Sequence, residues 1–294
     1  MAISGTTKLL GIIGDPVEHS MSPDMHNRAI AELGLDYVYV PFPVKPQDLE
    51  AAMAGFVAIG VVGFNATIPH KQAVMTYLDA ITPEAQAIGA VNTVWRSDRG
   101  WEGTNTDVIG FLAPLRDLVA RQASVQRCFD RPMVVLGHGG AARAVVAGAS
   151  QLGCPLVHVV GRTPEKVEAF VRSWEDSPIA VNLQAHCFPD LATLLPEAGI
   201  IVNSTPLGMH PHTNRSPLSA ELVDRISSDA IAYDLIYTPS PTLFLQQAQR
   251  QGVIAIDGLE MLVRQGAAAF ELWVGQAPSI ATMRQALRER LGLV

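Results

Sequence analysis

The chain has 294 residues, of which 48% are hydrophobic and 17% charged, and its formal net charge is -7. This composition is typical of a globular protein with a sizeable core and room for two domains. The acidic balance argues against nucleic acid as a partner, because phosphate binding requires clustered Lys and Arg. We therefore expect a small-molecule ligand.

The start of the sequence lacks a signal-peptide pattern, and no apolar run approaches the roughly 18 residues of a membrane span. We therefore expect a cytoplasmic protein with no membrane partner. Cys128, Cys154 and Cys187 have neither the spacing of a zinc site nor the even count of a disulfide framework, so they are interpreted as reduced thiols and no metal is expected.

Short β-rich runs alternate with helical patterns in the first third of the chain. Strands are predicted at 9–14, 37–44 and 61–67, helices at 22–34, 46–56, 69–78 and 106–120, and a hairpin at 91–105. The alternation indicates βαβ units around a mostly parallel sheet. Ser22 is predicted to be the N-cap of its helix, since Pro23 and Asp24 suit a first turn.

A polar segment, 121–132, precedes a second alternating series. Strands are predicted at 133–137, 156–161, 199–206, 230–237 and 253–258, and helices at 140–153 and 163–174. The last segments, 259–275 and 279–292, have helical patterns and are expected to pack back on the first domain. The predicted fold class is therefore α/β with two domains, the second a Rossmann-like, doubly wound one.

The run "VVLGHGGAARA" carries a G-x-G-x-x-A motif, with Gly137, Gly139 and Ala142 after a strand and at the start of a helix. In that context glycines let the backbone approach a pyrophosphate, and the helix N-terminus stabilises its charge. The alternative is a glycine-rich turn without a ligand. The flanking strand and helix favour dinucleotide binding.

The acidic residue that holds the ribose hydroxyl of NAD is missing about 20 residues further on. The run "VHVVGRTPEK" instead offers Arg162, Thr163 and Lys166. Cationic side chains there suit a 2′-phosphate, although both could simply decorate a helix start. The pattern favours NADP as cofactor, with NAD less favoured.

The run "NATIPHK" (65–71) sets His70 beside Lys71 at the end of a predicted strand. Histidine is the usual choice for proton transfer because it titrates near neutral pH. Neighbouring helical residues point about 100° apart, so only one of the two can face a site easily. Further polar residues stand at strand-to-helix junctions, and each also has a structural explanation, for example as a cap or turn residue. These junctions form the edge where open α/β sheets bind ligands. The residues are Ser20, Ser22, Asn65, Thr67, Asn92 and Asp107.

Eight ordered motifs span Gly14 to Trp273: "GDPVEHSMSPDMHN", "GFNATIPHK", "IGAVNT", "GTNTD", "LGHGGAARA", "NSTPLGM", "YDLIYTPSPTLFL" and "GLEMLVRQGAAAFELW". Together they resemble the successive motifs of the shikimate dehydrogenase family. The resemblance implies an oxidoreductase that interconverts 3-dehydroshikimate and shikimate with NADP(H). It also implies a substrate-binding catalytic domain at 1–109 plus 259–294 and an NADP-binding Rossmann domain at 110–258.

The resemblance implies roles for individual residues. Lys71 is the acid/base and Asp107 its partner, while Ser20 and Ser22 hold the substrate carboxylate. The other substrate-binding residues implied are Asn65, Thr67, Asn92, Tyr237 and Gln265. The cofactor-binding residues implied are Gly137, Gly139, Gly140, Ala141, Arg162, Thr163, Lys166, Thr205, Leu235, Gly258 and Met261. His70 is then a solvent or packing residue, and the protein a monomer or homodimer.

Three positions differ from the commonest form of the family: His138 stands between the first two glycines of the loop, Ala66 replaces a branched residue, and Gly161 replaces an asparagine. Alternative functions are a dehydrogenase of quinate or aminated shikimate analogues, or an NADP- and shikimate-binding sensor with little turnover. A folate-type methylene dehydrogenase is disfavoured by the two serines.

Overall fold

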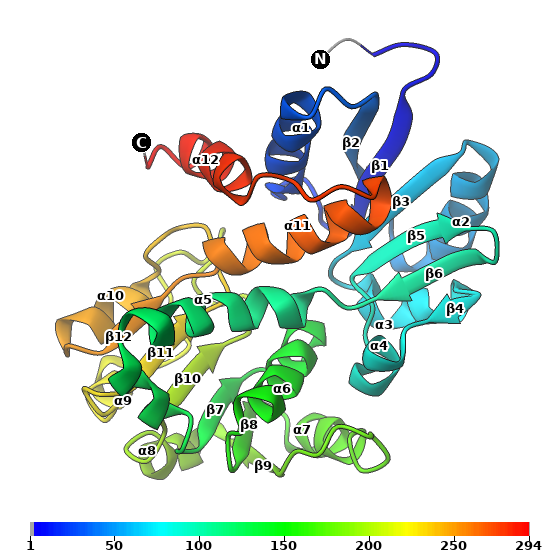
Figure 1. The fold of residues 1–294 in the computed structure, drawn as a ribbon. Helices are drawn as coiled ribbons and strands as arrows, with labels where there is room; N and C mark the ends of the chain where they lie inside the picture. Colours follow the sequence, from blue (N-terminus) through cyan, green and yellow to red (C-terminus); the bar gives the residue numbers. More distant parts are fainter. Residues whose placement is uncertain (1–2, 294) are drawn as a thin grey trace. The chain divides into compact units, whose positions relative to one another are not determined.

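The structure is a computed structural model that describes residues 3–293 and divides into two compact units (Figure 1). The first unit comprises the described residues up to Gly110 and from Leu262 onward, and the second comprises Phe111–Met261. The two divisions fall inside helices α5 (Asp107–Arg121) and α11 (Leu259–Val274). The polar segment 121–132 lies within the second unit. Which ligand each unit binds stays a prediction here.

The sheet of the first unit has the strand order β2-β1-β3-β5-β6-β4. Strand β1 pairs in parallel with β2 and β3, and β4 pairs in parallel with β6, whereas β3, β5 and β6 pair antiparallel. The sheet is therefore mostly parallel with the predicted hairpin inserted. Its strands are β1 (Lys8–Gly14), β2 (Tyr37–Pro43), β3 (Val61–Ala66), β4 (Ala80–Ile81), β5 (Thr93–Ser97) and β6 (Gly100–Thr104).

Successive residues of β3 face opposite sides of this sheet. Phe64 packs with Phe56 of α2 on one side, whereas Gly63 faces Trp273 of α11, whose Nε1 donates a hydrogen bond to the Val94 carbonyl at 2.9 Å. A β-carbon on Gly63 would lie 2.3 Å from Cδ1 of Trp273, so the close approach of α11 requires glycine. The remaining helices of this unit are α1 (Ser22–Glu32), α2 (Leu49–Ala58), α3 (His70–Ala73), α4 (Pro83–Ile88) and α12 (Ile280–Arg290).

The sheet of the second unit is parallel throughout, with the order β12-β11-β10-β7-β8-β9. Counted from β7, this is the doubly wound order of dinucleotide-binding folds, and it reverses between β7 and β10. The strands are β7 (Met133–Leu136), β8 (Val157–Gly161), β9 (Leu183–Cys187), β10 (Ile200–Asn203), β11 (Ile231–Asp234) and β12 (Ile254–Ile256). The other helices are α6 (Gly140–Leu152), α7 (Pro164–Arg172), α8 (Leu191–Leu194), α9 (Ala220–Val223) and α10 (Leu243–Arg250).

The predicted α/β class is confirmed. Helix α11 from Leu262 onward and all of the described α12 belong to the first unit, with α12 packed along α1 (Figure 1). Several elements were not predicted from the sequence: β4, β9, α4, α8, α9 and α10. Strand β4 has only two residues, and β9 is a partly exposed edge strand without an apolar run. The predicted helix 69–78 is a short α3 followed by a 3₁₀ turn at Val74–Tyr77.

Candidate active site

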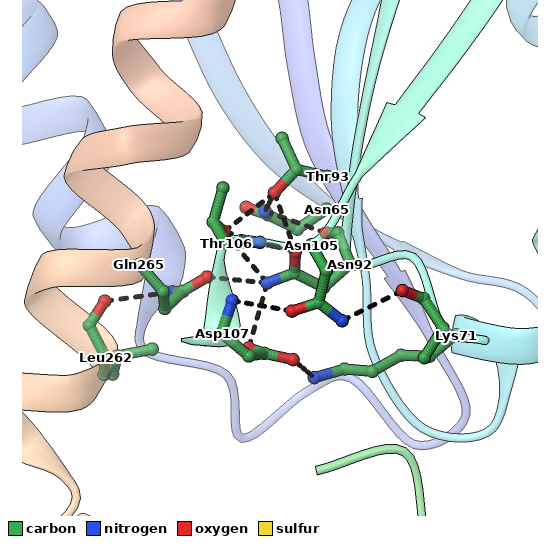
Figure 2. A network of polar contacts seen from close by, with 10 residues as sticks. Asn65, Lys71, Asn92, Thr93, Asn105, Thr106, Asp107, Leu262 and Gln265 are labelled. Carbon is green, nitrogen blue, oxygen red and sulfur yellow. Dashed lines mark hydrogen bonds and ion pairs between the residues drawn. The ribbon is translucent and has the colours of Figure 1, made fainter. Parts of the chain in front are cut away.

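An ion pair between Lys71 and Asp107 lies at the end of the first sheet (Figure 2). Lys71 stands on α3, directly after β3, and Asp107 is the first residue of α5. Their Nζ and Oδ2 atoms are 2.5 Å apart, and the side chains are only 14% and 7% exposed. Within residues 3–293 the Lys71 ammonium has no other acceptor. Two of its three N–H donors therefore remain available to a ligand.

Asn92 holds the second oxygen of the Asp107 carboxylate. Its Nδ2 donates to Asp107 Oδ1 at 2.9 Å and to Gln265 Oε1, on α11, at 3.2 Å. Its own Oδ1 accepts from the Thr106 backbone N–H at 2.7 Å. Asn105 fixes the Asp107 backbone by accepting from its N–H at 3.0 Å. The carboxylate is thus oriented from both sides (Figure 2).

Asn65 is buried and has both ends of its amide engaged within the protein. Its Oδ1 accepts from the Tyr39 hydroxyl at 2.7 Å, and its Nδ2 donates to the Asn92 carbonyl at 3.1 Å. Burial raises the pKa of Tyr39, and a hydrogen bond with Ser22 partly opposes that shift. A polar chain therefore runs from Ser22 through Tyr39 and Asn65 to Asn92.

The prediction that Ser22 caps α1 is wrong. Met21 occupies the N-cap position, no side chain caps the helix, and Ser22 is its first residue. The hydroxyl of Ser22 is buried and contacts Tyr39, while its backbone N–H donates to Ser20 Oγ at 3.3 Å. Helix capping does not use these hydroxyls, and because a hydroxyl has one donor and two acceptor positions, each keeps hydrogen-bonding capacity for a ligand. The hydroxyl of Thr67, directly after β3, forms no hydrogen bond within the described part of the chain.

His70 is a packing residue rather than a solvent-exposed one. It is buried, and its Nε2 is 2.6 Å from the carbonyl oxygen of Val44. Since a carbonyl only accepts, this nitrogen must carry the proton. Pro69 was predicted to be the first residue of this helix, but it lies at the N-cap position and α3 begins at His70. His70 therefore points away from the group that Lys71 joins.

The glycine loop of the second unit fits a pyrophosphate. Gly137 adopts φ 107°, which favours glycine, and a β-carbon there would lie 2.7 Å from Ser204 Oγ. Gly139 precedes α6, with Gly140 and Ala141 in the first turn, and no side chain caps this helix. A β-carbon on Gly139 would meet no atom within 4 Å. Uncapped backbone N–H groups therefore face open space at the point where the sheet reverses.

The end of β8 provides the cations expected there. Arg162, Thr163 and Lys166 are exposed. The first acidic residue after the strand is Glu165, in the first turn of α7. In residues 3–293 neither Arg162 nor Lys166 forms an ion pair or side-chain hydrogen bond. These free cations suit a phosphate on the ribose.

A buried network that was not predicted from the sequence holds the loops after β10 and β11. Asp234 Oδ1 accepts from Asn203 Nδ2 at 3.0 Å and from the Ile236 N–H at 3.1 Å, and its Oδ2 accepts from Thr242 at 2.7 Å. Burial raises the pKa of Asp234 to about 7, although these donors oppose the shift. Asn203 in turn accepts from the N–H and hydroxyl of Thr205. The signal in the sequence that could have revealed this network is the presence of Asn203 and Asp234 at the ends of otherwise apolar strand runs.

The other predicted residues of the second unit lie at these same strand ends. Leu235 and Tyr237 follow β11 and are half-buried. Gly258 allows a close backbone approach, because a β-carbon there would lie 2.1 Å from the Leu235 carbonyl oxygen. Met261 is buried on the first turn of α11. The structure thus gathers Lys71, Asn92, Asp107 and Gln265 in the first unit, while Tyr237 belongs to the second.

No helix among the described residues is long and apolar enough to cross a membrane. In residues 3–293 no three His, Cys, Asp or Glu side chains are grouped as metal ligands.

Two family models match the chain. Residues 12–94 match the shikimate dehydrogenase substrate binding domain, and residues 258–288 match the shikimate 5′-dehydrogenase C-terminal domain. A protein of Trichormus variabilis named shikimate dehydrogenase (NADP(+)) is 59% identical over 293 residues, covering 99% of this chain and 100% of the relative.

Solved structures match with similar coverage. A shikimate dehydrogenase in complex with NADP+ is 38% identical with a TM-score of 0.85, covering 99% of this chain and 98% of its own. A shikimate 5-dehydrogenase of Listeria monocytogenes, in complex with shikimate and NAD, is 33% identical with a TM-score of 0.84, covering 98% of each chain.

Proposed function

This chain belongs to the shikimate dehydrogenase family, and from that premise we propose that it is an NADP-dependent enzyme that interconverts 3-dehydroshikimate and shikimate. The observation that carries the proposal is the Lys71–Asp107 pair, held by Asn92 at the edge of the first sheet. The likeness to NADP-named relatives over nearly the whole chain supports the activity and the cofactor.

Reduction of a ring ketone needs a hydride on carbon and a proton on oxygen. NADPH supplies the hydride when it is bound. One N–H donor of the Lys71 ammonium binds Asp107, which leaves two donors for the ketone oxygen of the substrate. The ammonium stabilises the developing alkoxide and transfers a proton to it. The neutral amine then regains a proton from solvent. In the oxidative direction the neutral Lys71 amine takes the hydroxyl proton.

Asp107 orients the Lys71 side chain, because its carboxylate binds Nζ through Oδ2 while Asn92 holds Oδ1. Ser20 and Ser22 bind the substrate carboxylate with hydroxyl groups that no helix cap employs. The Thr67 hydroxyl and Gln265 contact the ring hydroxyls, whereas the role of Tyr237 as a substrate-binding residue comes from the family resemblance. Asn65 contributes indirectly, because both ends of its amide are already hydrogen-bonded within the protein. It accepts from Tyr39 and donates to the Asn92 carbonyl, and so helps to position these two residues.

The second unit holds NADP(H). The backbone N–H groups of Gly139, Gly140 and Ala141 at the start of α6 would hold the pyrophosphate. Gly137, whose own N–H donates to the Val160 carbonyl, would supply the tight turn that lets the loop approach it. Arg162, Thr163 and Lys166 bind the 2′-phosphate, which favours NADP over NAD. Thr205, Leu235, Gly258 and Met261, in and after the loops that follow β10 to β12, would hold the nicotinamide half. Asn203 and Asp234 position these loops.

Purified protein should produce NADPH, seen as rising near-ultraviolet absorbance, from shikimate and NADP+. Lys71→Ala should lower kcat by about 100-fold to 10,000-fold while shikimate binding, measured by calorimetry, persists. Lys45→Ala is the matched control, because Lys45 is exposed and away from the network. Parallel assays with quinate and NAD+ separate the related dehydrogenases. A wild type that binds shikimate but turns over no pair of these substrates would favour the sensor function instead.

We also propose a cytoplasmic monomer or homodimer. Light scattering coupled to size exclusion measures its mass directly, and a larger assembly would contradict this part of the proposal.

A further inference from the structure

The ring of His138 lies over Gly161 at the carboxyl ends of β7 and β8. A β-carbon on Gly161 would be 2.9 Å from Cδ2 and 3.5 Å from Nε2 of His138, and 2.4 Å from Cγ2 of Val167. The imidazole therefore occupies the room that a side chain at position 161 would need. His138 comes from the glycine loop, whereas Gly161 ends the neighbouring strand. The ring thus bridges the two strand ends.

His138 stands between two features that favour an anion. On one side, Gly139 and the uncapped start of α6 face open space. On the other, Gly161 is followed directly by Arg162, and Lys166 lies one helical turn on; both are exposed and without partners in residues 3–293. The His138 ring is half-buried and also forms no hydrogen bond within the described residues. Its ring nitrogens are therefore available to a ligand.

In a doubly wound fold the end of the second strand, here β8, faces the ribose of the adenosine half. We propose that His138 is a specificity residue that donates a hydrogen bond to the 2′-phosphate of this ribose, beside Arg162 and Lys166. The inference rests on the proposed NADP dependence and adds a residue from the glycine loop to it. Because NAD lacks this phosphate, the contact of His138 favours NADP.

The test measures binding without turnover. Calorimetric titrations use adenosine 2′,5′-bisphosphate, which carries the 2′-phosphate but no nicotinamide, and ADP, which lacks that phosphate. We expect His138→Ala and His138→Phe to bind the bisphosphate about 10-fold more weakly, while affinity for ADP changes by less than about twofold. Phe keeps a ring over Gly161 without an N–H, so it separates hydrogen bonding from packing.

His138→Gln, which retains an N–H donor, should recover part of the affinity. His212→Ala is the control, because His212 is exposed in a different loop of the same unit. Unchanged binding of the bisphosphate by His138→Phe would overturn the inference, as would an equal loss of both probes in His138→Ala. A wild type that binds the bisphosphate no more tightly than ADP would instead refute the NADP dependence itself. The two failures are therefore distinguishable.

Discussion

His26 is the buried group whose protonation we expect to weaken the first unit in mild acid. Its ring is 0% exposed and stacks on Tyr39, with centroids 4.3 Å apart. Within the described residues neither ring nitrogen has a hydrogen-bond partner. Burial lowers the pKa of His26 from 6.5 to about 3, because the imidazolium would lose its hydration in an apolar site.

The sign of the pH dependence follows from that shift. Between the two pKa values His26 is protonated in the unfolded chain and neutral in the folded state. The contribution of His26 to the free energy of unfolding is therefore fully present above pH 6.5 and decreases as the pH falls towards about 3. Each pH unit in this window costs about 1.4 kcal/mol. At about pH 5 the loss amounts to about 2 kcal/mol, which is a large part of a typical folding free energy.

Urea unfolding of the wild type and His26→Phe at about pH 7 and pH 5 measures this loss. Phe keeps a ring against Tyr39 and Trp273 but cannot be charged, so the variant should lose about 2 kcal/mol less than the wild type over this interval. Other titrating groups are common to both proteins and cancel in the comparison. Exposed His212→Ala should follow the wild type. Equal pH slopes in wild type and His26→Phe would refute the reasoning.

Two further changes probe the sites. Asn92→Ala removes the amide that donates a hydrogen bond to Asp107 Oδ1. The variant should lower kcat by about 100-fold, with a smaller effect on shikimate binding. An unchanged kcat would show that Asn92 does not orient the carboxylate. Gly258→Ala would place a β-carbon 2.1 Å from the Leu235 carbonyl oxygen and should destabilise the protein by about 1–3 kcal/mol in thermal unfolding. Gly55→Ala, in open space on α2, is the matched control and should stabilise instead; equal effects would contradict the steric argument.

Much of the fold was predictable because its signals are local. The buried strand before Gly137 and the helix after Gly139 lie within one short segment, and both were predicted from the sequence. Edge strand β9 escaped prediction because it carries no apolar run. Asn203 and Asp234 escaped because their partners come from other strands and loops.

The candidate site divides in the same way. The sequence by itself determined which residues stand at strand ends, and its motifs pointed to Lys71 and Asp107 through resemblance. General chemistry would have preferred His70. The contacts of the two neighbours came only from the tertiary structure, which pairs Lys71 with a carboxylate 36 residues away and joins the His70 ring to the Val44 carbonyl. Local patterns set backbone conformation, whereas the contacts of a side chain depend on what distant segments place beside it.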